Sequence, residues 1–121
     1  MISFYQRLQK IKEKPGLYIG YPSISDLFIF LCGYRRACQD MGLTLSDEEL
    51  QFHEFQPWLQ KKFRLSTSAS WAKIILLYSS DETHAFQMFF ELLEEFLNSR
   101  SQLDKIEEKS EEKQIVQTSF S

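Results

Sequence analysis

The stretch DETHAFQMFFELLEEFLNSR, residues 81–100, carries the strongest helical pattern of the chain. Ser80 is the predicted N-cap, with Asp81 and Glu82 in the first turn and Arg100 in the last. The apolar residues form one broad face, made by Phe86, Phe89, Phe90, Leu93, Phe96 and Leu97 and widened by Ala85, Met88 and Leu92. A helix with so wide an apolar face needs cover on more than one side, so the remaining segments must pack around it.

Two segments on the N-terminal side supply helical patterns of their own. Residues 2–13 read as an amphipathic helix that ends at Pro15 and Gly16. Next, ISDLFIFLCGYRRACQDMG is apolar on several faces, with Ser23 as its predicted N-cap and Gly42 as its C-terminal glycine. This second helix is therefore expected to lie centrally.

The middle of the chain, residues 43–80, predicts shorter helices. Ser46 and Glu49 form an S-x-x-E capping box, and Pro57 predicts a turn followed by a second short helix, PWLQKKF. After the polar loop RLSTSAS, the segment WAKIILLYS fits either a helix or a strand. Its few β-branched residues and the lack of a partner strand favour the helix.

Length and composition predict an all-α fold: a single compact domain of about five helices with an aromatic-rich core. The chain has 121 residues, of which 11 are Phe, 5 Tyr and 2 Trp, enough to build a core without disulfides. The predicted organisation is a helical domain over residues 1–100, followed by a charged C-terminal helix extension and tail over residues 101–121.

Charge and hydropathy argue against two classes of partner. The net charge is −3, and the densest basic runs, YRRACQ and LQKKFR, fit solvated helix faces, so nucleic acid is not an expected partner. The apolar runs are too short for a membrane span, and the N-terminus lacks a signal-peptide pattern, so we expect a cytoplasmic protein. Cys32 and Cys38 are spaced too far apart on one helix for a disulfide and are expected to be buried thiols.

The run KEKPGLYIG, with Gly20 at its end, resembles the R-P-G-M-Y-I-G segment in ATPase domains of type II topoisomerases. That family holds its nucleotide mainly through other motifs, including D-x-G-x-G, and none of them occurs in this sequence. We therefore interpret the run as a connector between helices, in which Gly16 and Gly20 provide the backbone freedom of a tight reversal. Tyr18 and Tyr21 are candidate partner-binding residues, because tyrosine is enriched at binding hot spots.

The sequence predicts no catalytic residue, no metal site and no cofactor, and hence no enzyme. His53 and His84 are the only histidines, whereas a convincing metal site needs three or four ligands at defined spacing. No G-x-S-x-G nucleophile motif is present, and the acids of ELLEEF lie on one helix rather than across a cleft.

A wider resemblance covers residues 4–97. The order of I-K-x-K-P-G-L-Y-I-G, L-x-x-F-L-x-G-Y, F-x-x-W, S-W-A-K-I-I and D-E-x-x-A-F-x-x-F-F-E-L-L-x-x-F resembles a group of small bacterial proteins. Some of that group are thought to act as immunity proteins beside polymorphic or contact-dependent toxins. The resemblance implies a non-enzymatic protein–protein interaction module whose partner is a cognate toxin, neutralised by occlusion of its active site.

Acidic side chains are the further candidates for contacting such a partner, since many toxins are nucleases with basic clefts. These candidates are Asp47, Glu48, Glu49, Glu91, Glu94 and Glu95. Two alternatives remain open at this point. One is a homo-oligomer that buries its excess phenylalanine between copies, and the other is a small-ligand or nucleotide-binding domain that uses the PGLYIG loop.

Overall fold

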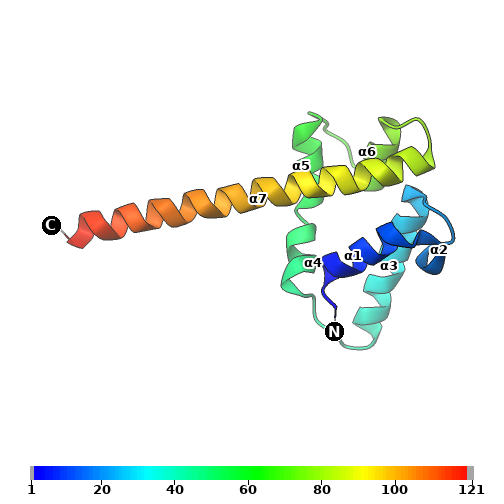
Figure 1. Cartoon of the computed structure of the whole chain (residues 1–121), viewed down its shortest axis with the longest axis horizontal. Helices are drawn as coiled ribbons and strands as arrows, with labels where there is room; N and C mark the ends of the chain where they lie inside the picture. The colour runs from blue at the N-terminus through cyan, green and yellow to red at the C-terminus, as the bar shows by residue number, and fades with distance from the viewer. Residues whose placement is uncertain (1, 120–121) are drawn as a thin grey trace. The chain divides into compact units, whose positions relative to one another are not determined.

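The computed structural model describes the backbone of residues 2–119 and the side chains of residues 2–109. Every regular element in this described part is a helix, which confirms the all-α class. Figure 1 shows α1 (Phe4–Glu13), α2 (Pro15–Tyr18), α3 (Ile24–Asp40), α4 (Asp47–Phe52), α5 (Phe55–Lys62), α6 (Trp71–Leu77) and α7 (Glu82–Ser119). Five of them have seven residues or more, in agreement with the predicted number.

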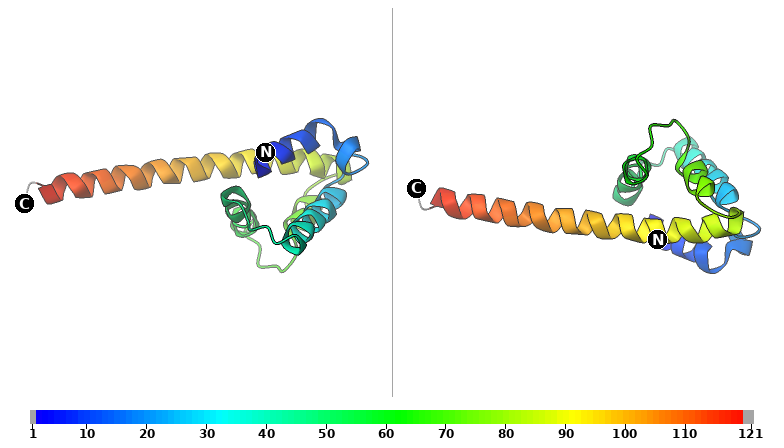
Figure 2. Two further views of the ribbon diagram at one scale, coloured as in Figure 1. Left: turned by 90° about the horizontal axis from the view of Figure 1, so that it is seen from below. Right: turned by 90° about the horizontal axis from the view of Figure 1, so that it is seen from above.

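The chain divides into two compact units, Met1–Glu91 and Leu92–Ser121. The first contains α1 to α6 and the start of α7. Within it, α3 lies beside α6, α4 lies beside α1 and α5, and α5 also contacts α6 (Figure 2). The hydrophobic core and the candidate site described below are built from these helices.

The PGLYIG run differs from the predicted connector in one respect. Pro15 occupies the first position of the one-turn helix α2, where a missing N–H has no intrahelical partner to lose. Gly16 lies inside this turn, so its expected role in a reversal was wrong. Gly20, with φ of 90°, does adopt the left-handed conformation that glycine favours.

The ends of α3 follow the sequence prediction. The Ser23 side chain accepts a hydrogen bond from the Asp26 N–H, which confirms it as the N-cap. At the other end, Gly42 has φ of 77°, and the Leu43 N–H donates to the Cys38 carbonyl at 2.9 Å. This is the Schellman arrangement, in which a left-handed residue lets the chain leave the helix with its last carbonyls paired.

The carboxylate of Glu82, the first residue of α7, also binds the N-terminus of α3. The Ser25 hydroxyl donates to one carboxylate oxygen at 2.7 Å, while the Ser25 N–H and the Ser23 hydroxyl donate to the other at 3.0 and 3.1 Å. The hydrogen bond from the Ser25 side chain is the main reason that the pKa of Glu82 lies below its ordinary value, with burial opposing it. Glu82 therefore fixes the start of α7 to the start of α3.

The predicted capping box of α4 is confirmed: the Ser46 side chain accepts from the Glu49 N–H, and the Glu49 side chain accepts from the Ser46 N–H. The predicted turn at Pro57 was misplaced. The break between α4 and α5 falls at His53 and Glu54, so Pro57 lies in the first turn of α5. A proline is tolerated there because the first N–H groups of a helix have no intrahelical acceptor.

The segment left open between helix and strand forms the helix α6, with Ser70 as its N-cap. At the start of α7, the cap is Asp81 rather than the predicted Ser80. The Asp81 carboxylate accepts from the His84 N–H at 2.7 Å, and the Ser80 N–H donates to His84 Nδ1 at 3.0 Å. Sequence spacing alone does not separate two adjacent residues that both make good caps.

Aromatic rings dominate the core of the first unit, as predicted. Trp71 of α6 and Phe89 of α7 stack with ring centroids 4.8 Å apart, and both pack against Phe55 of α5 at 6.1 and 5.6 Å. Phe52 of α4 stacks on Phe55 at 5.4 Å. These rings come from four helices, so the side chains that join the elements are also the largest ones.

The second unit consists of the later turns of α7. Its helix continues to Ser119, and Leu103 and Ile106 are 53% and 60% exposed. Across the described residues, no helix is both long and apolar enough to cross a membrane. The predicted boundary between a domain and a tail at residue 100 stays a prediction.

Candidate functional site

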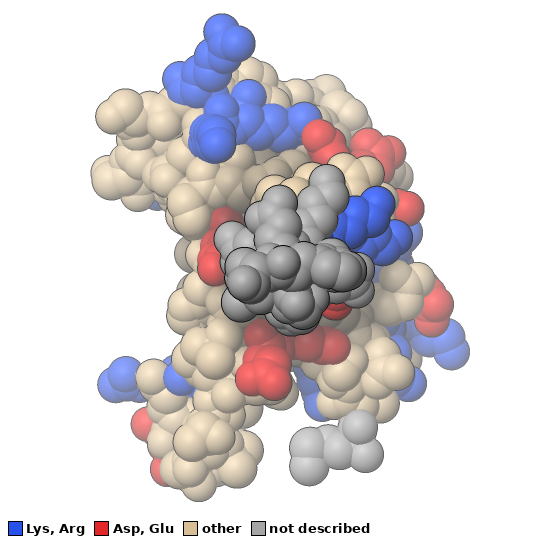
Figure 3. All heavy atoms as spheres, turned by 90° about the vertical axis from the view of Figure 1, so that its left-hand side faces the viewer, with Lys and Arg blue, Asp and Glu red and all other residues tan. Residues whose placement is uncertain are grey.

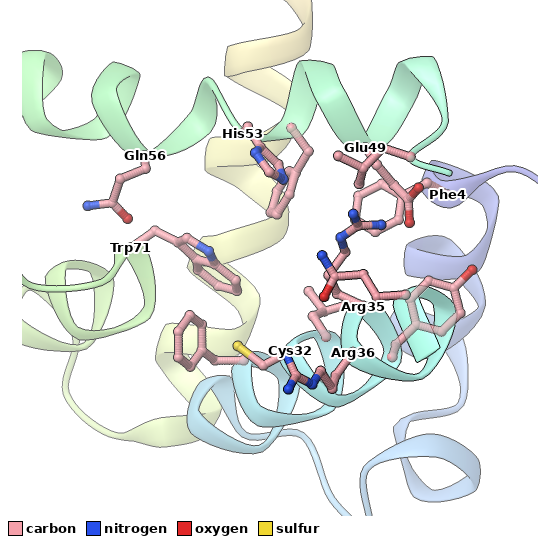
Figure 4. Close-up of a pocket in the computed structure, with 14 residues that line it drawn as sticks. Phe4, Cys32, Arg35, Arg36, Glu49, His53, Gln56 and Trp71 are labelled. Carbon is pink, nitrogen blue, oxygen red and sulfur yellow. The ribbon is translucent and has the colours of Figure 1, made fainter. Parts of the chain in front are cut away.

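The first unit contains a pocket of about 500 Å³ among its helices. In Figure 4, α4 and α5 lie above this pocket and α3 lies below it, with Trp71 on one side and Arg35 on the opposite side. One further side chain, Phe4, comes from α1. Five helices therefore contribute to one cavity, although their residues are distant in sequence.

The pocket walls are largely aromatic. Phe4 lies 5.2 Å from Phe52, and Trp71 lies 5.3 Å from Phe28 and 5.8 Å from Phe52, measured between ring centroids. Phe52 and Trp71 also belong to the aromatic core. Because the rings of the wall are packed into the core behind it, the pocket is pre-formed by the fold.

The polar groups of the pocket come mostly from α3, α4 and α5: Cys32, Tyr34, Arg35, Arg36, Gln39, Glu49, His53 and Gln56. Gln56 and Glu49 each make one structural hydrogen bond. Gln56 Nε2 donates to the Ala69 carbonyl at 2.9 Å, and Glu49 accepts from the Ser46 N–H at 2.8 Å.

Arg35 differs from these residues. Its Nη1 atom is buried, yet it has no hydrogen-bond partner in the described structure. The neighbouring Arg36 is exposed, and its Nε lies 3.9 Å from the Asp40 carboxylate. A buried donor without an acceptor is costly, so Arg35 is the group in the pocket with an unmet requirement.

Tyr34 forms part of the same wall and is neutral at physiological pH. Burial is the main cause that raises its pKa, and a hydrogen bond with the Cys38 side chain acts in the same direction. Arg7 of α1 lies 5.2 Å from the Tyr34 ring centroid, a cation–π contact.

The two cysteines have different environments. Cys38 is buried, as expected, but Cys32 is exposed and lines the pocket, so the expectation that both thiols are buried was wrong. Helix periodicity places the two six residues apart on different faces of α3, and only one face is covered. Within the described residues, no three His, Cys, Asp or Glu side chains are placed to hold a metal ion.

The tyrosines and the acids of α4 are only partly available. Tyr21 is 53% exposed, whereas Tyr18 is half-buried with its ring 6.3 Å from Phe30. Asp47 is exposed, but the half-buried Glu48 accepts a hydrogen bond from the Tyr5 N–H at 2.9 Å. Glu49, the remaining candidate on α4, is the only one of these residues that lines the pocket.

The three candidate acids of α7, Glu91, Glu94 and Glu95, are exposed. Glu91, Glu94 and Glu95 lie three and four residues apart, which places them together on one face of this helix. In Figure 3, basic side chains gather at the top, the end where α5 lies in Figure 1, and acidic and basic side chains intermix elsewhere on the visible face. Lys61 and Lys62 occupy the last turn of α5.

Sequence reasoning missed the pocket and the buried Nη1 atom of Arg35. The run YRRACQ was noted for its charge but interpreted as a solvated face. One signal was available in the sequence. Arg35 follows Leu31 by four residues, so the two side chains lie on the same face of a helix that is apolar on several faces. None of the pocket residues comes from the PGLYIG run.

Comparison of the chain with protein-family models, with curated proteins and with solved structures finds no match in any of the three.

Proposed function

We propose that this chain is a non-enzymatic protein–protein interaction module, an immunity protein that neutralises a cognate bacterial toxin by covering its active site. The proposal draws on the resemblance over residues 4–97 and on the surface of α7. Between Glu82 and Ser99 the sequence contains no lysine or arginine, and Glu91, Glu94 and Glu95 are exposed on one face. This acidic face is the observation that carries the proposal.

An acidic face of this kind suits a partner with a basic cleft. Carboxylates spaced along a helix attract the lysines and arginines that a nuclease uses to bind phosphates, and they accelerate association at low salt. Tyr21 and Asp47, both in the first unit, are the other exposed candidates, a tyrosine and a further negative charge. Binding over the cleft excludes the substrate without any chemical step.

The alternative of a homo-oligomer is less well supported. It was suggested by the phenylalanine excess, but Phe52, Phe55, Phe86, Phe89 and Phe90 contact other rings within the first unit. Their abundance is explained by the core of a single chain.

The test begins with capture of the tagged protein from its native host and identification of a stoichiometric partner. Binding of the purified partner is then measured for the native chain and for the double variant Glu91→Lys/Glu94→Lys. We expect the reversal to weaken binding about ten-fold or more and to slow association at low salt. The matched control is Glu13→Lys, which reverses an exposed charge on α1 and leaves affinity unchanged. Equal binding by all three proteins would contradict the acidic face as the binding surface.

A further inference from the structure

We propose that the pocket of the first unit binds a small organic anion that has an aromatic body and one carboxylate, with the carboxylate placed on Arg35. This site is separate from the acidic face of α7 and does not depend on the proposed function. The inference rests on three properties of the pocket: its volume, its ring-lined walls and its single unsatisfied cation.

The volume and the walls suit an aromatic body. Small-ligand pockets usually enclose about 300–1,000 Å³, and this one encloses about 500 Å³. Phe28, Phe52 and Trp71 present ring faces and edges that favour stacked or edge-on contact with a flat ligand. Trp71 also stacks on Phe89 at 4.8 Å, so the fold already holds this wall in place before a ligand enters.

Arg35 determines the charge of the ligand. Its Nη1 atom is buried and lacks an acceptor in the described structure, while the side chain lines the pocket. A carboxylate oxygen is the strongest acceptor for a guanidinium, and the planar fork of arginine matches its two oxygens. An anionic ligand therefore supplies an acceptor for a buried donor that has no partner in the described structure.

The other charged groups favour one negative charge rather than several. Arg36 and Glu49 also line the pocket, so its lining carries two guanidinium groups and one carboxylate. Arg36 is exposed and lies near Asp40, which reduces its contribution. Glu49 repels a second carboxylate, and the amide of Gln56 already donates to the Ala69 carbonyl. Arg35 is thus the position in the pocket that attracts an anion most strongly.

The experiment is calorimetric titration of the full-length protein with 2-naphthoate and with its neutral counterpart 2-naphthamide. The two probes share the same rings, so their difference in affinity reports the charge alone. We expect 2-naphthoate to bind about ten-fold tighter or more. Shifts of the Trp71 indole N–H signal in NMR spectra will locate the site.

Three variants make the assignment specific. Arg35→Gln should reduce the affinity for 2-naphthoate about ten-fold and leave that for 2-naphthamide unchanged. Lys73→Gln removes an exposed charge from α6 outside the pocket lining and should change neither affinity. Glu49→Gln keeps a side chain that can accept in the capping box, and it should tighten 2-naphthoate binding about two-fold or more because it removes a repelling charge. Circular dichroism will confirm that each variant is folded.

Equal affinity for the two probes would overturn the proposal, as would no heat of binding at millimolar concentration. An unchanged affinity in a folded Arg35→Gln protein would also overturn it. If Arg35→Gln fails to fold, the Glu49→Gln result decides, because only an anion in the pocket gains from that change.

Discussion

Glu82 joins two segments of the first unit that lie far apart in the sequence. Its carboxylate accepts hydrogen bonds from both Ser23 and Ser25, which lie 59 and 57 residues away in sequence. These hydrogen bonds are charge-assisted, and the negative charge of the carboxylate also interacts favourably with the dipole at the N-terminus of α3. Glu82 was predicted only as a favourable charge in the first turn of its own helix, because sequence spacing does not reveal contacts between distant segments.

The substitution Glu82→Gln should lower the free energy of unfolding at neutral pH by about 2 kcal/mol. The amide of Gln has an NH₂ group in place of one carboxylate oxygen, so it cannot accept at both positions where Ser23 and Ser25 donate. Since the pKa of Glu82 is lowered in the folded state, its stabilisation is present above the unfolded value of 4.5 and is lost as pH falls through the folded value. Urea denaturation should therefore show a gap between the two proteins that narrows on acidification. A gap that is constant with pH would contradict this account. Glu13→Gln, at an exposed residue of α1, should show no difference from the native protein at any pH.

Arg64 occupies the position after α5 that Gly42 occupies after α3. Both end a helix in a Schellman arrangement, but Arg64 adopts φ of 54° with a full side chain. Arg64→Gly should raise the free energy of unfolding by about 0.5–1 kcal/mol, because glycine has no Cβ to strain in this conformation. Gly42→Ala should lower it by about 1 kcal/mol through backbone strain alone, since an added Cβ meets no atom within 4 Å. Thermal denaturation measures both variants. Melting temperatures that shift in the same direction for the two would contradict the account.

At the scale of elements, the helix starts that depend on local spacing were predictable. The caps at Ser23 and Ser46 require only residues three positions apart, and both form as expected. The errors occurred where two local solutions compete. Pro57 can begin a helix or lie in its first turn, and the Pro15 segment can form a loop or one helical turn. Packing of the flanking residues selects between them, and that information is not local.

The capping box of α4 gives a direct test at this scale. Ser46→Ala removes the acceptor for the Glu49 N–H and should lower the free energy of unfolding by about 1 kcal/mol. Ser68→Ala in the exposed loop before α6 is the matched control and should change it by less than about 0.5 kcal/mol. Chemical denaturation of the two variants measures the difference, and equal effects would show that the box contributes nothing specific.

At the scale of the whole molecule, the all-α class and the aromatic core followed from composition and periodicity. The pocket did not, because it requires side chains from Phe4 to Trp71 to converge, and no sequence pattern records that convergence. Several of the residues that carried the family resemblance, including Trp71 and Phe89, are buried in the core. They therefore describe how the protein folds more directly than what it binds.

Phe89→Ala tests the role of this core. The ring is fully buried and contacts rings from α4, α5 and α6, so its loss should lower the free energy of unfolding by about 3–5 kcal/mol. Ile29→Ala, at a residue that is 66% exposed, should cost less than about 1 kcal/mol. A small effect of Phe89→Ala on the denaturation midpoint would contradict the packing described above.

The central functional claim is that this chain neutralises a toxic partner. The most direct measurement is the survival of bacteria that express the captured partner alone, with the native chain, or with the Glu91→Lys/Glu94→Lys variant. We predict that cells die with the partner alone, survive when the native chain is present, and lose this protection with the variant. Unimpaired growth with the partner alone, or equal protection by the charge-reversed variant, would contradict the claim.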